Sequence, residues 1–407
     1  MRILAIETSC DETGIAIVDA KTSADRIPKT VRVLANTLIS QASLHAQFGG
    51  VFPAVARREH GKNIIPLLLH ALTESGLAKK LKSPRTLTKK EETNLAKIFY
   101  KEPELLVSFK EALLYLKVPA IDAVAVTSGP GLEPALWVGI NTAEALGALW
   151  GVPVIPVNHM EGHIVASLMS TTDNGKNFSL TPPKYPAVAL LISGGHTELV
   201  LMPSAGKYKM LGQTRDDAVG EAFDKVARML GLAYPGGPEI SKLAEKAPNH
   251  EKLSSPLPRP MIKSGDFDFS FSGLKTSVLY AIKKFETLTD RDRKLIAKDF
   301  EDSVTEVLVT KTITAAKQNK AQEIVLGGGV TANKKIRGAF TNAVAKELPD
   351  TSLFIPTVLL SGDNGLMIGV AALLRSKPKK HIVANGNMRL AKSVSPTLAE
   401  LRKKKKV

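Results

Sequence analysis

Two histidines stand four positions apart in the segment VNHMEGHIVA, residues 157–166. Side chains at that spacing leave the same face of a helix, so His159 and His163 can share one metal ion, although such a pair is more often an ordinary helix face. A zinc protease needs a Glu directly after the first His or directly before the second, and Glu161 occupies neither place. With Asn158 as N-cap, Glu161 suits a capping box instead, which disfavours a metalloprotease.

A third metal ligand has to come from elsewhere in the chain. The motif SGDNGLM follows a predicted strand at 352–356, as the histidines follow one at 152–157, and this correspondence nominates Asp363. The alternative is that Asp363 caps the helix NGLMIGVAALL, and one carboxylate can do both. Two neutral imidazoles and a carboxylate leave open positions on a first-row metal such as iron or zinc.

Glycine-rich turns occur as SGGH (193–196), PGG (235–237) and GGG (327–329). Glycines let backbone N–H groups approach a phosphate closely, although each turn alone is a weak signal. None is followed by the Lys-Ser/Thr of a Walker loop, so ordinary P-loop hydrolysis is not supported.

Four further polar side chains are candidates for a site. Asp224, in the helical pattern of residues 216–232, either reaches a ribose diol or is a solvated helix charge. Asp11 and Glu12, in the turn SCDET, are too acidic to bind phosphate directly but could order water, a metal or a substrate amine. Cys10 is better explained as a small core residue than as a nucleophile, since no His stands near it.

The elements that carry these residues occur twice. The strand-turn-strand pattern at 2–19 returns at 187–202. A strand, glycine-rich turn, helix and strand follow it over 121–157, and the same order returns over 322–356. This self-similarity predicts an internal duplication.

Strands that alternate with helices predict an α/β fold with substantial parallel pairing and two related lobes facing one another across a cleft. We expect an N-terminal lobe at 1–158, a C-terminal lobe at 159–363 and a helical region at 364–395 that packs back on the first lobe. Since His159 and His163 directly follow the last strand of the first half and Asp363 follows the last strand of the second, we expect the histidines to meet Asp363 across the two lobes. Residues 79–118 read as helical material inserted on a lobe surface.

Charge favours a polyanionic partner. The chain has 407 residues and a formal net charge of +16, with 55 Lys or Arg against 39 Asp or Glu. Ten Lys or Arg against five Glu fall in 79–118, and a basic tail spans 396–407. This surplus favours phosphate backbones. Aromatic residues make up only 5%, so an RNA surface built on stacking is not indicated.

Cysteine usage and hydropathy bear on location. A single cysteine excludes an intrachain disulfide and a Cys-based zinc cluster, as is typical of a reducing compartment. No run reaches the length of a membrane span, and the N-terminus lacks the pattern of a signal peptide. We therefore expect a cytoplasmic protein with no membrane contact.

Nine ordered motifs resemble one family, the tRNA threonylcarbamoyladenosine transferases of the bacterial TsaD type, formerly called O-sialoglycoprotein endopeptidases. The motifs run from residue 3 to about 370 and are LAIETSCDETGIAI, SQASLHAQFGGVFPAVARREH, TSGPGL, VNHMEGH, LLISGGHTEL, DDAVGEAFDKVARMLGLAYPGGP, FDFSFSGLKT, GGGVTAN and SGDNGLMIG. The resemblance implies an actin/sugar-kinase/heat-shock-protein fold, which is a duplicated ribonuclease H-like fold.

The implied activity is transfer of a threonylcarbamoyl group from threonylcarbamoyl-AMP to the exocyclic amine of the adenosine 3′ of the anticodon, in tRNAs reading codons that begin with A, with release of AMP. The resemblance assigns His159, His163 and Asp363 to one divalent metal, most often Fe²⁺, with Zn²⁺ or Mg²⁺ as alternatives. It assigns Asp11 and Glu12 to catalysis. It assigns the adenylate to Leu191, Ile192, Ser193, Gly194, Gly195, Asp224, Gly237 and Asn333.

The resemblance also implies partners besides tRNA. Bacterial members work with a related subunit that lacks the metal site and with a small P-loop ATPase, whereas mitochondrial relatives form homodimers. An ATP-using kinase or ATPase of the same fold is the main alternative activity.

Overall fold

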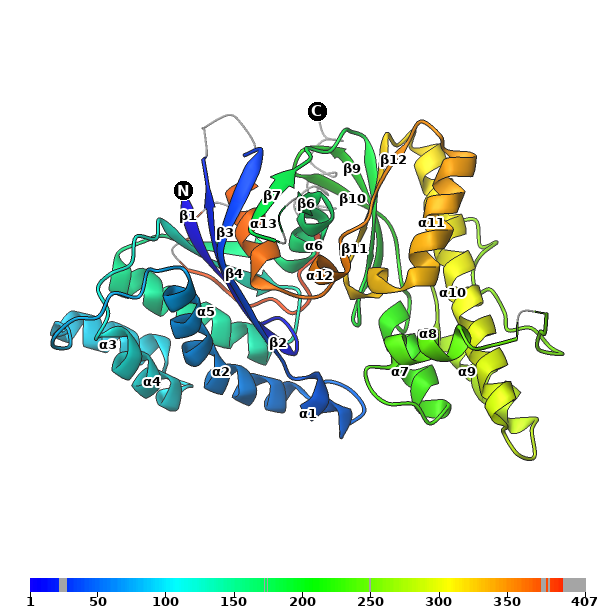
Figure 1. Cartoon of the computed structure of the whole chain (residues 1–407), viewed down its shortest axis with the longest axis horizontal. Helices are drawn as coiled ribbons and strands as arrows, with labels where there is room; N and C mark the ends of the chain where they lie inside the picture. The colour runs from blue at the N-terminus through cyan, green and yellow to red at the C-terminus, as the bar shows by residue number, and fades with distance from the viewer. Residues whose placement is uncertain are drawn as a thin grey trace, which may run out of the picture. The chain divides into compact units, whose positions relative to one another are not determined.

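The computed structural model describes residues 1–21, 28–171, 173, 175–248, 250–374, 378–379 and 381–390. They form two compact units (Figure 1). Unit 1 comprises residues 1–182 and 357–388, and unit 2 comprises 183–356 with 389–390 among the described residues. The expected boundaries after 158 and 363 therefore differ from these, and residues 159–182 and 357–363 lie in unit 1. The basic tail, 396–407, lies outside the described residues, as do 375–377, 380 and 391–395 of the expected helical region 364–395.

Unit 1 is built on a seven-stranded mixed sheet in the order β5-β4-β1-β2-β3-β7-β6. The predicted hairpin at its centre pairs β1 with β2 antiparallel, from Arg2 opposite Asp19 to Glu7 opposite Gly14. β4 and β5 add in parallel, and β3 adds antiparallel. The strands are β1 (Arg2–Glu7), β2 (Glu12–Ala20), β3 (Thr30–Ser40), β4 (Ala123–Gly129), β5 (Val154–Asn158), β6 (Met169–Thr171) and β7 (Asn177–Leu180).

Unit 2 repeats the core of this plan. Its five strands run in the order β10-β9-β8-β11-β12, with β8-β9-β10 antiparallel and β11 and β12 added in parallel. Strand by strand this is the order of β3-β2-β1-β4-β5, so the predicted duplication and the α/β class are confirmed. The strands are β8 (Ala187–Ile192), β9 (Thr197–Ser204), β10 (Lys207–Gln213), β11 (Glu323–Gly327) and β12 (Ser352–Phe354).

Helices cover both faces of the unit 1 sheet. Alternate residues of β1 point to opposite faces, so Leu4 and Ile6 pack in one core and Ile3 and Ala5 in another. The first core includes residues of α2 (Pro53–Glu74), α3 (Lys89–Ile98), α4 (Pro103–Leu113) and α5 (Glu133–Trp150). The second includes residues of α6 (His159–Ser167), α12 (Val358–Ser361) and α13 (Gly365–Leu374). A short helix, α1 (Ala42–Ala46), follows β3.

One large core underlies unit 2, where the apolar β8 residues Val188, Leu190 and Ile192 pack with Phe223, Phe300 and their neighbours. The long helix α10 (Asp290–Gln318) begins in a capping box formed by Thr289 and Asp292. The other helices are α7 (Val219–Met229), α8 (Gly236–Ala244), α9 (Ser272–Lys283), α11 (Lys334–Glu347) and the 3₁₀ turn η1 (Gly329–Ala332). Among the described residues, no helix is both long and apolar enough to cross a bilayer.

Candidate metal centre and nucleotide pocket

Three side chains of unit 1 converge at the predicted metal position. Nε2 of His159 and Nε2 of His163 lie 3.3 and 3.2 Å from Oδ1 of Asp363. One ligand atom of each residue lies within 4.8 Å of the others. We expected Asp363 to come from the other lobe, and this was wrong. The chain re-enters unit 1 at residue 357 because the apolar side chains of α13 pack against β1 and β2.

Two asparagine caps fix the helices that carry these ligands. The predicted N-cap of α6 is confirmed, since Oδ1 of Asn158 accepts from the backbone N–H groups of Met160 and Glu161. At α13 the cap is Asn364, whose Oδ1 accepts from the N–H of Met367 at 2.9 Å. Asn364 therefore caps α13 in place of Asp363, and the Asp363 carboxylate faces the imidazoles instead.

Behind His159 lies a carboxylate that sequence reasoning missed. Oε2 of Glu7, which is fully buried, lies 3.1 Å from Nδ1 of His159. The same carboxylate accepts from the hydroxyl of Thr127 and the N–H of Ser9, both at 2.5 Å. A carboxylate on the far nitrogen of a metal-binding imidazole fixes its orientation and raises its basicity. The signal was available, because Glu7 ends a strand that otherwise reads as core.

Protonation in this cluster follows burial and charge. Burial alone would lower the pKa of His159, but the carboxylates of Asp363 and Glu7 outweigh it and raise that pKa well above its usual range. Burial would raise the pKa of Asp363, yet the adjacent His159 holds it well below its usual value. Burial lowers the pKa of His163, which favours the neutral imidazole.

The donor set fits a divalent cation. Both ring nitrogens of His163 are buried. Among the described residues, Nδ1 has no hydrogen-bond partner, and Nε2 faces Oδ1 of Asp363 at 3.2 Å without a regular hydrogen bond. Buried polar atoms without partners are costly, and a cation at Nε2 would satisfy one of them. Two imidazoles and one carboxylate are ligands that iron and zinc accept.

The turn SCDET lies beside this centre. Asp11 is buried and Glu12 half-buried, and charge interactions couple Glu12 to Asp11 and Asp363. Burial and the charges of Asp11 and Asp363 raise the pKa of Glu12 to about 10. Burial and the same acids raise the pKa of the Cys10 thiol well above its usual value, which disfavours a thiolate nucleophile there.

A buried histidine that the sequence analysis passed over holds this turn in place. Nε2 of His60, on α2, lies 3.0 Å from the carbonyl oxygen of Cys10, and its Nδ1 lies 2.8 Å from Oγ1 of Thr13. Gln41 links His60 to His45, which is also fully buried. The motif SLHAQFGGVFPAVARREH thus supplies a polar support for Asp11 and Glu12.

In unit 2 two of the glycine-rich turns, at 193–196 and 327–329, lie close together. Leu191 and Ile192 end β8 and are fully buried, and Ser193, Gly194 and Gly195 form the turn that follows. A Cβ on Gly328, whose φ is +94°, would lie 2.4 Å from the carbonyl oxygen of Ile192. A Cβ on Gly220 would lie 2.8 Å from Cα of Gly194. By contrast, a Cβ on Gly194, Gly195 or Gly237 would meet nothing within 4 Å, so open space faces these glycines.

Asp224 has a structural role that neither expectation, a ribose contact or a solvated helix charge, included. Its Oδ1 accepts from the N–H of Gly236 at 2.7 Å and so holds the start of α8, the helix that also contains Gly237. A Cβ on Gly236 would lie 2.8 Å from Cα of Asp224, so this approach of α7 to α8 requires a glycine.

Asn333 also has a structural task. Its Oδ1 caps α11 by accepting from the N–H of Ile336 at 3.0 Å. Its Nδ2 donates to Oγ of Ser241 at 2.9 Å and to Oε1 of Glu301 at 2.7 Å. Ser241 donates to the same Glu301 oxygen. Glu301, buried on α10, therefore ties α8 to α11. No sequence pattern predicts this contact, because the three residues lie far apart in the chain.

Comparison with known proteins places the chain in a family. The family model for tRNA N6-adenosine threonylcarbamoyltransferase, TsaD, matches residues 32–82 and 104–370. It leaves out 83–103, a shorter internal stretch than the expected insertion 79–118. Proteins named tRNA N6-adenosine threonylcarbamoyltransferase from Burkholderia ambifaria (strain MC40-6), Burkholderia lata and Burkholderia multivorans are each 40% identical over 381 residues, which is 92% of this chain and 92% of theirs.

Solved structures give more distant likenesses. The activator of the 2-hydroxyisocaproyl-CoA dehydratase from Clostridium difficile with bound ADPNP is 13% identical, with a TM-score of 0.44 over 92% of this chain and 94% of that one. HypF from T. kodakarensis is 16% identical, with a TM-score of 0.45 over 67% of this chain and 43% of that one. The sequence matches are decisive: the chain belongs to the tRNA N6-adenosine threonylcarbamoyltransferase family of transferases.

Proposed function

We propose that the chain transfers a threonylcarbamoyl group from threonylcarbamoyl-AMP to N6 of the adenosine 3′ of the anticodon, in tRNAs reading codons that begin with A. The observation that carries this proposal is the convergence of His159, His163 and Asp363, buried or nearly so, in a chain of this transferase family. A tRNA substrate also suits the net charge of +16. We also propose that the protein acts in the cytoplasm, which suits a tRNA substrate.

One divalent metal, which we propose to be Fe²⁺, would be held by His159, His163 and Asp363. When bound, it would act as a Lewis acid on an oxygen of the donor. Glu7 would keep His159 in the tautomer whose Nε2 faces the cation, because Nδ1–H donates to the Glu7 carboxylate.

The adenylate part of the donor would bind in unit 2. We propose that the open backbone at Gly194, Gly195 and Gly237 admits the phosphate, and that Asp224 contributes to recognition of the ribose. The cap formed by Asn333 and the buried Glu301 would keep this pocket in shape. Leu191 and Ile192, at the end of β8, would fix the position of the turn that follows them.

The reaction needs no protein nucleophile, because the adenosine amine attacks the carbamoyl carbon. A C–N bond forms, the C–O bond to the phosphate breaks, and AMP leaves with the electron pair. We propose that the Asp11 carboxylate takes the proton that the amine gives up. Glu12, which holds its proton at neutral pH, would donate a hydrogen bond within the same turn.

Two assemblies suit a member of this family. We propose that the chain works either with a related subunit lacking the metal site and a small P-loop ATPase, or as a homodimer. The transfer assay therefore needs each arrangement as a separate arm.

The experiment combines elemental analysis with transfer of labelled threonine from threonylcarbamoyl-AMP to tRNA. Purified chain should hold one metal per subunit, release AMP and label tRNA. His163→Ala should lose both metal and transfer, whereas His70→Ala, an exposed histidine on α2, should keep both. Matching melting temperatures would show that both variants fold. Unlabelled tRNA with the wild-type chain and every partner present would refute the proposal.

A further inference from the structure

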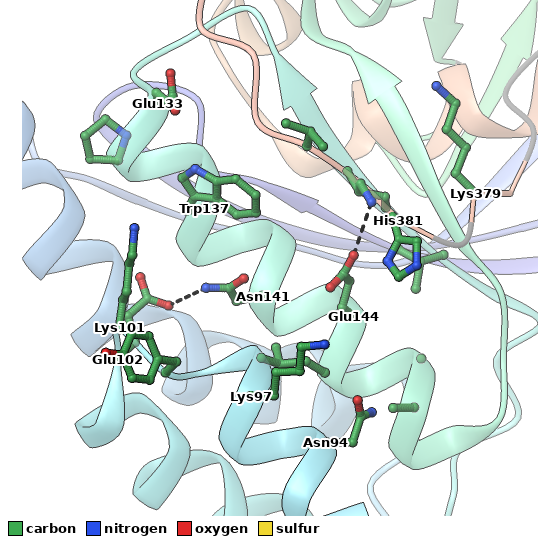
Figure 2. A pocket seen from close by; sticks show the side chains of 18 of the residues that line it. Asn94, Lys97, Lys101, Glu102, Glu133, Trp137, Asn141, Glu144, Lys379 and His381 are labelled. Atoms are coloured by element: carbon green, nitrogen blue, oxygen red, sulfur yellow. Dashed lines mark hydrogen bonds between the residues drawn. The ribbon is translucent and has the colours of Figure 1, made fainter.

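A cavity of about 1120 Å³ lies in unit 1 along the outer side of α5. Figure 2 shows α5 as its floor, with side chains of the 94–102 segment on one side and Lys379 and His381 on the other. None of the residues proposed above for the metal or the donor lines it.

One wall comes from the stretch that the family model leaves unmatched. Within residues 83–103, helix α3 and the segment after it supply Asn94, Lys97, Ile98, Tyr100, Lys101 and Glu102 to the lining. Helix α3 is anchored from beneath, because Leu95 and Phe99 are buried in the same core as α5. The cavity is therefore a built feature of this chain that the family model does not account for.

The floor is a single stripe of α5. Glu133, Trp137, Asn141, Glu144 and Ala148 follow one another at intervals of three or four residues, so they share one helix face. The Trp137 ring is half-buried on this face, and Figure 2 shows it along the middle of the floor. An aromatic plane at the base of an open groove is a surface on which a base can stack.

Hydrogen bonds and one ion pair fix the walls, and the ion pair with Arg57 neutralises one of the three acids, Glu102. Glu102 accepts from Nδ2 of Asn141 at 3.0 Å and lies 3.5 Å from Arg57, which also donates to the carbonyl of Lys101. Oε1 of Glu144 accepts from the N–H of Ile382 at 3.2 Å. The groove is thus held by contacts of its own.

The remaining charge is mainly positive. Within the described part of the chain, Lys97, Lys101 and Lys379 form no ion pair with an acid, and all three are exposed. Two acids oppose these lysines. Glu133 lies at the end of the floor away from Lys97 in Figure 2, and Glu144 accepts from the N–H of Ile382. Tyr100, 81% exposed, stands beside Lys101 at the rim. Unpaired lysines near one exposed and one half-buried aromatic ring suit a nucleic acid strand, which presents both phosphates and bases.

We propose that this groove is an accessory tRNA-binding site, in which a nucleotide of the substrate tRNA places its base against Trp137 and its phosphates against Lys97, Lys101 and Lys379. The proposal rests on tRNA being the substrate. It also revises the expectation from composition, because the few aromatic residues include two at one basic groove. The volume exceeds the roughly 300–1,000 Å³ of a typical small-molecule pocket, which favours part of a larger ligand.

The test compares two double variants in and just after α3. Lys97→Glu with Lys101→Glu changes the groove, and Lys89→Glu with Lys90→Glu makes the same charge change at the other end of α3, outside the lining. We expect the first pair to weaken binding of labelled tRNA about tenfold or more at low salt. The slope of log affinity against log salt should also fall by about 1–2, since each phosphate contact contributes roughly 0.7–0.9. The control pair should change the tRNA affinity and the salt slope much less.

Trp137 provides a local signal, since the other tryptophan, Trp150, is buried. Addition of tRNA should quench tryptophan fluorescence in the wild type and much less in Trp137→Phe. Free AMP should not quench it at concentrations that saturate the donor pocket. If the Glu pair fails to fold, Lys97→Gln with Lys101→Gln should weaken binding in the same direction.

Three outcomes would overturn the proposal. Equal weakening by the two lysine pairs would mean a diffuse field rather than a site. Saturable quenching by AMP would mean a site for free nucleotides. Normal tRNA binding with lost assembly on a companion protein would mean a protein interface. Wild-type chain that binds tRNA with quenching but transfers nothing would count against the proposed reaction and leave the groove standing.

Discussion

Oε2 of Glu7 lies 3.1 Å from Nδ1 of His159, on the side of the imidazole opposite Asp363. The fully buried Glu7 thus connects the end of β1 to a candidate metal ligand 152 residues later in the chain. Because of this contact, the orientation of the His159 ring depends on the sheet as well as on α6.

Glu7→Gln should lower metal affinity roughly tenfold to a hundredfold, because an amide orients the imidazole less firmly and does not raise its basicity. Metal content after dialysis against a graded chelator measures this. Thr127→Val, which removes only a donor to Glu7, should have a smaller effect. Full metal retention in Glu7→Gln would show that the contact does not support the centre.

Gly365→Ala should destabilise the protein by about 1–3 kcal/mol, since the added Cβ would lie 2.7 Å from the backbone nitrogen of Ala16. The strain should move α13 away from β2 and carry Asp363 from the histidines, so metal content should fall as well. Gly362→Ala is the matched control, because a Cβ there meets nothing within 4 Å. Denaturant unfolding and elemental analysis of both variants decide the matter, and equal behaviour would contradict it.

Glu301→Ala should weaken AMP binding about tenfold, because Asn333 and Ser241 lose the carboxylate that joins α11 to α8. Leaving these half-buried donors without an acceptor should also cost about 1 kcal/mol in stability. Isothermal titration with AMP gives the affinity. The AMP affinity of Glu301→Gln should lie between those of the wild type and Glu301→Ala. Glu306→Gln, on the exposed side of the same helix, should bind AMP normally. Unchanged AMP affinity in Glu301→Ala would remove Glu301 from the pocket.

Glu12→Gln should make the metal-free protein less sensitive to pH. The pKa of Glu12 is raised to about 10 in the folded state, so its proton is held there but released from the unfolded chain above its ordinary pKa. The contribution of Glu12 to stability should therefore be greatest at acidic pH and decline as pH rises toward about 10, by at most about 1.4 kcal/mol per pH unit. Unfolding free energies of wild type, Glu12→Gln and the exposed control Glu104→Gln between about pH 5 and pH 9 test this. A wild-type slope identical to that of Glu12→Gln would argue against a protonated Glu12.

Relationships within one element or between repeated elements were predictable from the sequence. The hairpins at 2–19 and 187–202, the glycine-rich turns and the duplication all follow from local patterns of apolar residues and glycines, and the strand orders agree. The strands β3 and β10 were not predicted, because the repeated strand-turn-strand patterns end before them, at residues 19 and 202. The cap at Asn158 and the shared face of His159 and His163 follow from helical geometry.

The sequence by itself determined which residue types follow the strand ends: two imidazoles, a carboxylate just before an apolar helix, and acids in the first turn. Only the tertiary structure decided that Asp363 shares unit 1 with the histidines, that Glu7 supports His159, and that residues 83–103 form a groove against α5. The physical reason is that spacing along the chain fixes directions only within an element. Which elements meet depends on burial of their apolar faces, here that of α13 on β1 and β2.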